Sequence, residues 1–298
     1  MIEMDFHPEV RAALDSKKPV VALESSVISQ GLPFPVNFET AIKLEEVIRA
    51  ENAVPATLAI FEGRVIVGCS KEQIHRLAID KQILKASSRD LGLILCKKLS
   101  AATTVASSIV ICKHAGIKVF ATGGIGGVHP LPQYGYPDIS ADIIELSRNP
   151  VLVVTAGAKS ILDLAGTLEA LETSAVPLVG YKTSKFPAFY VRETNLSLPQ
   201  INTPNEIAEM CKSHWNWSSS SVLACNPIDS SFGLELQQWE GWLEEANRAA
   251  SLNGIHGKEL TPYLLQKVSD LSNKRTLVAN VELLKGNAKL AAHIASFI

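Results

Sequence analysis

A lysine among small residues is the first candidate for chemistry in this sequence. Lys159 stands in the segment Thr155-Ala-Gly-Ala-Lys159-Ser160, where an apolar run ends and a helical pattern begins. The N-terminus of a helix disfavours a cation, so a neutral amine is favoured there. A neutral amine can attack a carbonyl and form an imine. Binding of an anion by Lys159 and the helix N–H groups is one alternative, and a purely structural lysine is another.

Carboxylates stand in two further segments. Glu24 directly follows the apolar run Pro19-Val-Val-Ala-Leu23. Partial burial would favour its protonated form and suit a general acid, whereas an N-cap or a salt bridge is the structural alternative. Asp138 and Asp142 flank Ser140, and a helix would place both carboxylates on one face. These oxygens suit Mg²⁺ or Mn²⁺, although an N-cap followed by a solvated aspartate is the alternative.

Two segments could contact a substrate through their backbone. The stretch Thr122-Gly-Gly-Ile-Gly-Gly-Val-His129 has His129 where the dinucleotide fingerprint needs a third glycine, and it is not a Walker loop. Its glycines permit close backbone approach and positive φ, which favours a substrate loop over a plain turn. Lys85 and the stretch from Ala102 to Ser107, which includes Thr104 and Val105, could hold a phosphate. Ordinary N-capping is the alternative for that stretch.

The elements that would position these residues alternate along the chain. Short apolar runs predict strands, and they are separated by helical patterns. The predicted strands are Pro19–Leu23, Ala56–Phe61, Arg64–Val67, Ile117–Thr122, Val151–Thr155, Val176–Gly180 and Val222–Cys225. The predicted helices are Asn37–Asn52, Lys71–Asp80, Ala101–Ala115, Ser140–Ser147, Ser160–Thr173 and Asn205–Ser213, followed by Leu234–Leu252, Glu259–Ser272 and Leu277–Phe297. This order predicts an α/β fold with a mostly parallel central sheet, helices on both faces and a helical C-terminal region, in one domain spanning residues 1–298.

Composition excludes several classes of protein. The net charge of −2 argues against a dedicated nucleic-acid binder. No stretch is long and apolar enough for a membrane span, and the start does not read as a secretory signal. Five cysteines without a CxxC pair indicate free thiols in a reducing cytoplasm. The histidines show no zinc-ligand spacing.

Together these segments resemble pseudouridine-5′-phosphate glycosidases, which are C-glycosidases of the pseudouridylate-synthase type. The resemblance covers nearly the whole chain and keeps the family's order. It is carried by Val20-Val-Ala-Leu-Glu24-Ser, Gly31-Leu-Pro-Phe-Pro35, Val54-Pro-Ala-Thr57, Ser88-Arg-Asp90, Ala102-Thr-Thr-Val-Ala106, Thr122-Gly-Gly-Ile-Gly-Gly-Val-His129, Asp138-Ile-Ser-Ala-Asp142, Ala156-Gly-Ala-Lys-Ser-Ile-Leu-Asp-Leu164 and Thr261-Pro262.

The resemblance implies a reversible reaction in which pseudouridine 5′-phosphate and water give ribose 5-phosphate and uracil. It implies that Lys159 forms an imine with C1′ of the ring-opened sugar, that Glu24 donates a proton during ring opening, and that Asp138 binds Mn²⁺. The implied substrate contacts are Lys85, Thr104, Val105, His129, Ser140, Ala141, Asp142 and Asn280. The resemblance also implies a homotrimer.

The chain departs from the family at several positions. Ser26 and Gln30 stand where Thr and His are expected, and Pro130 stands where Arg is usual. The loop Leu131–Pro137 is about one residue longer than usual, and Gly286 replaces an asparagine. These departures bear on base specificity. They keep open a C-nucleoside 5′-phosphate synthase that joins ribose 5-phosphate to another base, and a phosphosugar-binding regulator without catalysis.

Overall fold

The computed structural model describes residues 3–130, 138–255 and 260–298. One sheet of 11 strands forms its centre, in the order β1-β4-β3-β2-β7-β8-β11-β9-β10, with β5 paired to β6 and β6 to β3. All strand pairs are parallel except β3 with β4 and β3 with β6. The strands are β1 (Met4–Phe6), β2 (Val20–Leu23), β3 (Val54–Phe61), β4 (Arg64–Val67), β5 (Leu84–Ala86), β6 (Ala101–Thr103), β7 (Val119–Ala121), β8 (Leu152–Thr155), β9 (Leu178–Tyr181), β10 (Gln200–Ile201) and β11 (Val222–Cys225).

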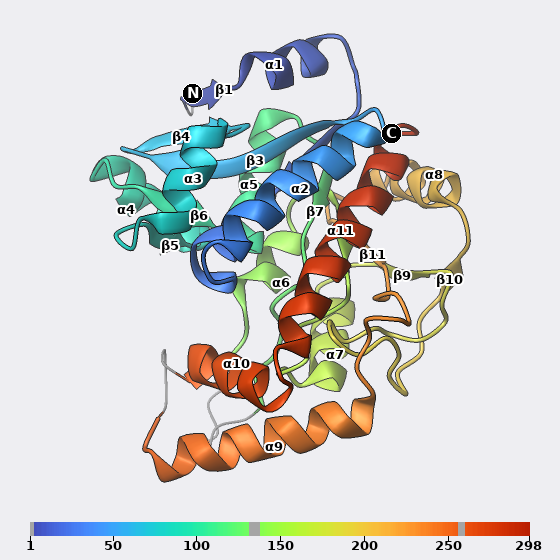
Figure 1. Ribbon diagram of the computed structural model, residues 1–298. Helices are drawn as coiled ribbons and strands as arrows, with labels where there is room; N and C mark the ends of the chain where they lie inside the picture. The colour runs from blue at the N-terminus through green and yellow to red at the C-terminus, as the bar shows by residue number, and fades with distance from the viewer. Residues whose placement is uncertain (1–2, 131–137, 256–259) are drawn as a thin grey trace.

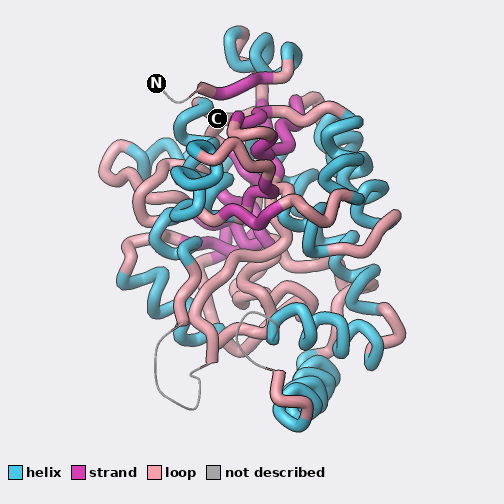
Figure 2. Tube along the Cα trace, turned by 90° about the vertical axis from the view of Figure 1, so that its left-hand side faces the viewer, coloured by secondary structure: helices cyan, strands magenta, loops and turns pink. Residues whose placement is uncertain are grey.

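Helices cover both faces of this sheet, as the edge-on view in Figure 2 shows. Helices α2 and α11 lie against one face, and α5 lies against β2, β6 and β7 behind the sheet (Figure 1). The helices are α1 (Pro8–Asp15), α2 (Val36–Ala50), α3 (Lys71–Ile79), α4 (Leu91–Cys96), α5 (Val105–Ala115), α6 (Ala141–Leu146), α7 (Leu164–Thr173), α8 (Pro204–Trp215), α9 (Leu236–Leu252), α10 (Leu260–Leu271) and α11 (Arg275–Ala295). Short π and 3₁₀ turns are η1 (Val27–Gly31) and η2 (Ser88–Asp90).

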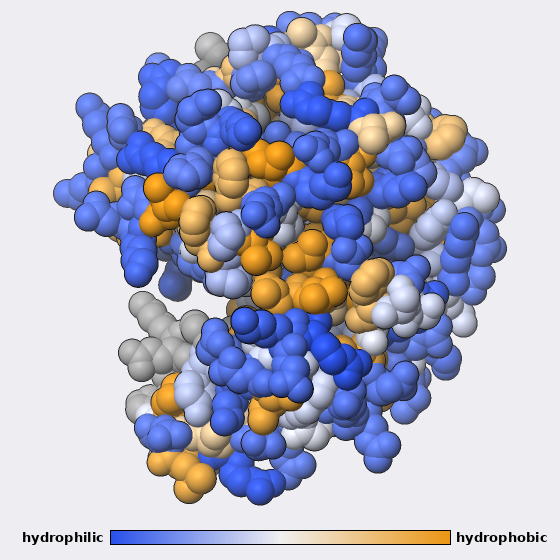
Figure 3. Space-filling model, viewed as in Figure 1, coloured by the Kyte–Doolittle hydropathy of each residue, from blue (hydrophilic) through white to orange (hydrophobic). Residues whose placement is uncertain are grey.

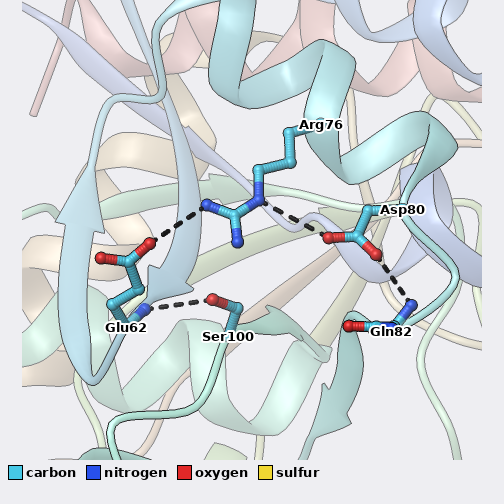
Figure 4. A network of polar contacts seen from close by, with 5 residues as sticks. All are labelled: Glu62, Arg76, Asp80, Gln82 and Ser100. Carbon is cyan, nitrogen blue, oxygen red and sulfur yellow. Dashed lines mark hydrogen bonds and ion pairs between the residues drawn. The ribbon is translucent and has the colours of Figure 1, made fainter.

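The β3–β4 hairpin closes the antiparallel side of the sheet. Glu62 and Gly63 have φ of 52° and 75°, so the predicted tight turn is present. The Glu62 N–H donates to the Ser100 hydroxyl at 3.1 Å, while Arg76 of α3 lies 3.4 Å from Glu62 and 3.5 Å from Asp80 (Figure 4). These ion pairs are largely exposed, so they fix the geometry of this edge more than they stabilise it.

The predicted fold class is confirmed, but the prediction omits β1, β5, β10, α1 and α4 and misplaces the starts of two helices. The helix predicted over Ala101–Ala115 is wrong at its start, because Ala101–Thr103 form β6 between β5 and β3. The helix predicted from Ser160 begins only at Leu164, where Asp163 caps it by accepting from the Gly166 N–H at 2.9 Å. An N-cap aspartate is a stronger start signal than the apolar pattern used for that prediction.

The main apolar core contains buried residues from nearly the whole chain, between Val10 and Ala295. Helix α11 belongs to this core, since it packs on β2, β7, β8 and α2. None of the helices in the described ranges is long and apolar enough to cross a membrane. The single domain over 1–298 stays a prediction.

Candidate active site

The site lies where the chain reverses its direction of travel across the sheet. Strands β2 and β7 are parallel neighbours, and the chain leads from β2 to β3 on one side and from β7 to β8 on the other. Open α/β sheets bind ligands outside the carboxyl ends of strands at such a point. Glu24 and Thr122 are the first residues after these two strands.

The Glu24 carboxylate is held on both oxygens. The Thr122 hydroxyl donates to Oε1, and the Ser26 hydroxyl donates to Oε2. Glu24 itself is half-buried, so part of the carboxylate edge stays open. The two hydroxyls fix the direction of the carboxylate, which a group that transfers a proton requires.

Lys159 is exposed in the loop between β8 and α7. The backbone N–H of Lys159 donates to the Ile125 carbonyl at 3.1 Å, and the backbone N–H of Ile125 donates to the Gly157 carbonyl at 3.0 Å. The catalytic-lysine candidate is therefore paired directly to the glycine-rich loop after β7. The helix dipole expected to act on it is absent at this position, because α7 starts at Leu164.

Ser160 fixes the loop that carries Lys159 through hydrogen bonds to neighbouring segments. Its buried hydroxyl donates to the Ala188 carbonyl at 2.5 Å and accepts from the Tyr190 N–H at 3.2 Å. The indole N–H of Trp239, in α9, donates to the Ser160 carbonyl at 3.3 Å. Helix α9, which lies below α7 and α10 in Figure 1, thus contacts the loop that carries Lys159.

The glycines of the segment after β7 allow close packing, as predicted, but against protein side chains. A Cβ on Gly124 would lie 2.4 Å from the Phe189 ring, and one on Gly126 would lie 2.4 Å from the Ser140 hydroxyl. Their φ values are not positive, in contrast to Gly157 in the lysine loop, whose φ is +84°. A role of this segment in substrate binding stays a prediction.

Asp142 joins two of the predicted substrate-binding segments. Its buried carboxylate accepts from the Ala106 N–H at 2.9 Å and from the Gly126 N–H at 2.7 Å. Asp138 lies outside α6, since Ser140 is the N-cap and Ala141 the first residue of that helix. The expectation that both carboxylates share a helix face is therefore wrong, because the helix starts after Asp138.

Two predicted contact residues have buried polar atoms that meet neither solvent nor a partner. Thr104 Oγ1 and Asn280 Oδ1 have no hydrogen-bond partner within the described part of the chain. Buried polar atoms are nearly always satisfied, so these two oxygens are candidates for contact with a ligand. Thr104 precedes Val105, the first residue of α5, so its hydroxyl stands at a helix N-terminus.

The charged groups act on one another across these segments. Lys85, in β5, is exposed by surface area, yet surrounding atoms withhold water from its ammonium group. That desolvation lowers the pKa of Lys85, and the charge of Lys159 lowers it further, against the opposing pull of Glu24 and Asp142. Lys85, Lys159, Glu24 and Asp142 therefore share one electrostatic neighbourhood, although they come from four separate segments.

Asp138 is the candidate metal ligand. It is exposed, its carbonyl accepts from the His129 N–H at 2.9 Å, and no described residue pairs with its carboxylate. No group of three His, Cys, Asp or Glu side chains that could hold a metal occurs within the described ranges. A single open carboxylate fits a hard cation such as Mg²⁺ or Mn²⁺ that keeps most of its water. The loop Leu131–Pro137 lies outside the described residues.

The sequence prediction missed the residues that brace the site. Thr122 was quoted only as part of a motif and Ser26 only as a departure, yet both hydroxyls bond Glu24. Asn287 of α11 donates to the Thr122 carbonyl at 2.7 Å. A polar residue inside an apolar helix pattern is a signal that could have marked Asn287.

Gly286 lines a cavity with Asn226 and Lys289, and none of the predicted site residues appears among the described residues lining it.

Comparison with known proteins places this chain in a class. The family model described as "Indigoidine synthase A like protein" matches residues 9–297. A solved structure of an indigoidine synthase A-like protein from Thermotoga maritima superposes with a TM-score of 0.88 at 32% identity, covering 99% of this chain and 96% of that one. The prealnumycin C-glycosynthase AlnA in complex with ribulose 5-phosphate gives a TM-score of 0.91 at 37% identity, with the same coverages of 99% and 96%.

Curated relatives narrow the class. The pseudouridine-5′-phosphate glycosidase of Caldanaerobacter subterraneus subsp. tengcongensis is 47% identical over 98% of this chain and 95% of its own length. That of Petrotoga mobilis is 46% identical over 98% of this chain and 96% of its own length. The chain belongs to the pseudouridine-5′-phosphate glycosidase family.

Proposed function

We propose that this enzyme reversibly cleaves the C–C glycosidic bond of pseudouridine 5′-phosphate to ribose 5-phosphate and uracil. Full-length relatives at 46–47% identity carry that name. The observation that carries the proposal is that the segment after β7 bonds both the Glu24 carboxylate, through Thr122, and the Lys159 backbone N–H, through Ile125. The charges of Lys159, Glu24 and Asp142 also act on the pKa of Lys85. A binding protein without catalysis would give no reason for a lysine and a hydrogen-bonded carboxylate to be joined to the same segment.

Lys159 acts as the nucleophile. Glu24 supplies a proton as the ribose ring opens, and the Lys159 amine bonds to C1′ of the open sugar. The C1′–C5 bond then breaks as the C1′–N bond becomes an imine, and C5 of uracil takes up a proton. Water hydrolyses the imine, which releases ribose 5-phosphate and restores the amine.

The phosphate lies between Lys85 and the start of α5. An N-terminal helix turn attracts anions, and the orphaned Thr104 hydroxyl can donate to a phosphate oxygen. Val105 offers its backbone N–H, and Ser140, Ala141 and Asp142 line the adjoining turn. Asn280 Oδ1 can accept a hydrogen bond from a sugar hydroxyl or a base N–H. His129 is a further predicted contact.

Asp138 holds one divalent cation, with Mn²⁺ as the ion we propose. A cation there would supply positive charge to the substrate's oxygens. Measuring Mn²⁺ binding by calorimetry gives a test besides turnover: Asp138→Asn should lose the binding, and unchanged binding would refute Asp138 as the ligand. The proposed homotrimer is checked by light scattering, and the cytoplasmic location stays a prediction.

Incubation with pseudouridine 5′-phosphate and Mn²⁺ tests the reaction. The expected result is release of uracil and ribose 5-phosphate in equal amounts, and no turnover would refute the proposed reaction.

The resemblance to AlnA, a C-glycosynthase, favours one alternative function, a C-nucleoside synthase. Condensation of ribose 5-phosphate with another heterocycle, but not with uracil, would establish that C-nucleoside synthase instead.

A further inference from the structure

We infer that Asn287 of α11 is a positioning residue for Glu24 and acts through Thr122. The inference rests on the proposed function, because it assumes that Glu24 transfers a proton. It assigns to the C-terminal helix a part in the reaction besides the predicted contact of Asn280.

The Asn287 side chain is 1% exposed and has every polar group engaged. Its Nδ2 donates to the Thr122 carbonyl at 2.7 Å and lies 3.4 Å from the Gly123 carbonyl. Its Oδ1 accepts from Asn226 Nδ2 at 3.1 Å. Since both Thr122 and Gly123 present acceptors, only one orientation of the amide satisfies the group.

Thr122 is consequently fixed from two sides. Its N–H donates to the Val154 carbonyl at 3.0 Å, which sets it against β8, and its carbonyl is held by Asn287 of α11. With both peptide groups fixed, the Thr122 hydroxyl points at Glu24 Oε1. Asn287, which lies 165 positions after Thr122 in the sequence, thus helps to determine where the Glu24 carboxylate lies.

Helix α11 presents Asn280 and Asn287 two turns apart on one face. Asn280 Oδ1 has no partner among the described residues, whereas Asn287 is fully bonded. The first asparagine is therefore available to a ligand, and the second is committed to the protein. A shift of α11 would move both together.

A double-mutant cycle tests the inference. Asn287→Ala is measured in the wild type and in a Thr122→Val background, with pseudouridine 5′-phosphate as substrate. Loss of one buried hydrogen bond predicts that Asn287→Ala lowers kcat about fivefold to tenfold, with KM changed less than about twofold. In the Thr122→Val background, the same change should lower kcat less than about twofold, because the hydroxyl that Asn287 aims is already gone.

Thr57→Val provides the matched background. Thr57 is also a buried threonine whose hydroxyl donates to a glutamate, Glu45, at 2.6 Å. It lines the same small cavity as Glu24, but its hydroxyl is bonded to Glu45 and not to Glu24. Asn287→Ala should keep its full effect on kcat there. An equal loss of kcat in the wild type and in Thr122→Val, or an effect on KM alone, would overturn the inference.

A second readout does not depend on turnover. The same cycle is run on urea unfolding midpoints, where the Thr122→Val and Asn287→Ala shifts should be less than additive. If the wild type cleaves no pseudouridine 5′-phosphate, the proposed function fails, and additive midpoint shifts would then refute the link as well. Asn287→Asp, which keeps the shape, replaces Asn287→Ala if that variant does not fold.

Discussion

Some polar side chains near the carboxyl edge of the sheet are hydrogen-bonded within the protein, and others are exposed to solvent. Thr122 and Ser26 hold Glu24, and Asp142 holds the N–H groups of Ala106 and Gly126. Lys159 and Asp138, by contrast, are exposed. This division matches the roles proposed for them, since a nucleophile and a metal ligand must reach the substrate.

Lys85 offers the clearest prediction for a single side chain. Replacing it with alanine removes the cation we place beside the phosphate, while Lys159 and Glu24 remain. The expected result is a KM for pseudouridine 5′-phosphate raised at least about tenfold, with a smaller change in kcat. Steady-state kinetics measure this, with Lys118→Ala as control because Lys118 packs over Trp215 before β7. A fall in kcat alone would show that Lys85 serves the chemical step instead.

The site residues could be predicted individually, but the residues that hold them in place by hydrogen bonds could not. Glu24 and Lys159 stand at strand ends, which a pattern of apolar runs reveals. The link from Asn287 to Thr122 depends on α11 packing across the sheet, and no local pattern encodes that distance. The error at the start of α7 has a different cause, because the Asp163 cap is a local signal that the apolar pattern outweighed.

At the scale of the elements, the lysine loop depends on one glycine. Gly157 has a φ of +84°, and a Cβ there would lie 1.8 Å from the Pro187 carbonyl oxygen. Gly157→Ala should lower the free energy of unfolding by about 2–5 kcal/mol, from left-handed strain and overpacking together. Chemical denaturation measures the loss.

Gly241→Ala is the matched control for that prediction. Gly241 lies inside α9, and a Cβ there would meet nothing within 4 Å. The substitution should raise the free energy of unfolding by about 0.5–1 kcal/mol, because alanine favours the helix. Equal effects of the two substitutions would refute the steric account of Gly157.

At the scale of the whole molecule, α11 and α2 are joined at one end by Glu51. His293 Nε2 lies 2.6 Å from Glu51 Oε2, and Lys289 lies 3.5 Å from Oε1. The hydrogen bond with His293 is the largest cause that lowers the pKa of Glu51 below its ordinary value of 4.5. A carboxyl with a lowered pKa stabilises the fold above its ordinary value and loses that contribution as pH falls through the lowered one.

Glu51→Gln should therefore lower the urea midpoint at neutral pH, and the difference from wild type should vanish as pH falls below 4.5. Unfolding curves between about pH 3 and pH 7 measure this. Glu244→Gln, in an exposed pair with Arg248, should leave the midpoint nearly unchanged throughout. A Glu51→Gln difference that persists in acid would point to lost packing rather than lost charge.

The alternation of strands and helices was enough to predict the α/β body. It was not enough to predict that α11 would cover the sheet, because an amphipathic helix does not encode which surface it packs on. Figure 3 shows a mainly hydrophilic face with an apolar area near its middle.

Borohydride trapping tests the central claim, that Lys159 is the covalent nucleophile, most directly. The enzyme is mixed with pseudouridine 5′-phosphate, reduced, digested and sequenced by mass spectrometry. The account predicts a reduced pentose-phosphate adduct on Lys159, and none after Lys159→Ala. An adduct on Lys85 or on any other lysine, or turnover that never yields an adduct, would contradict it.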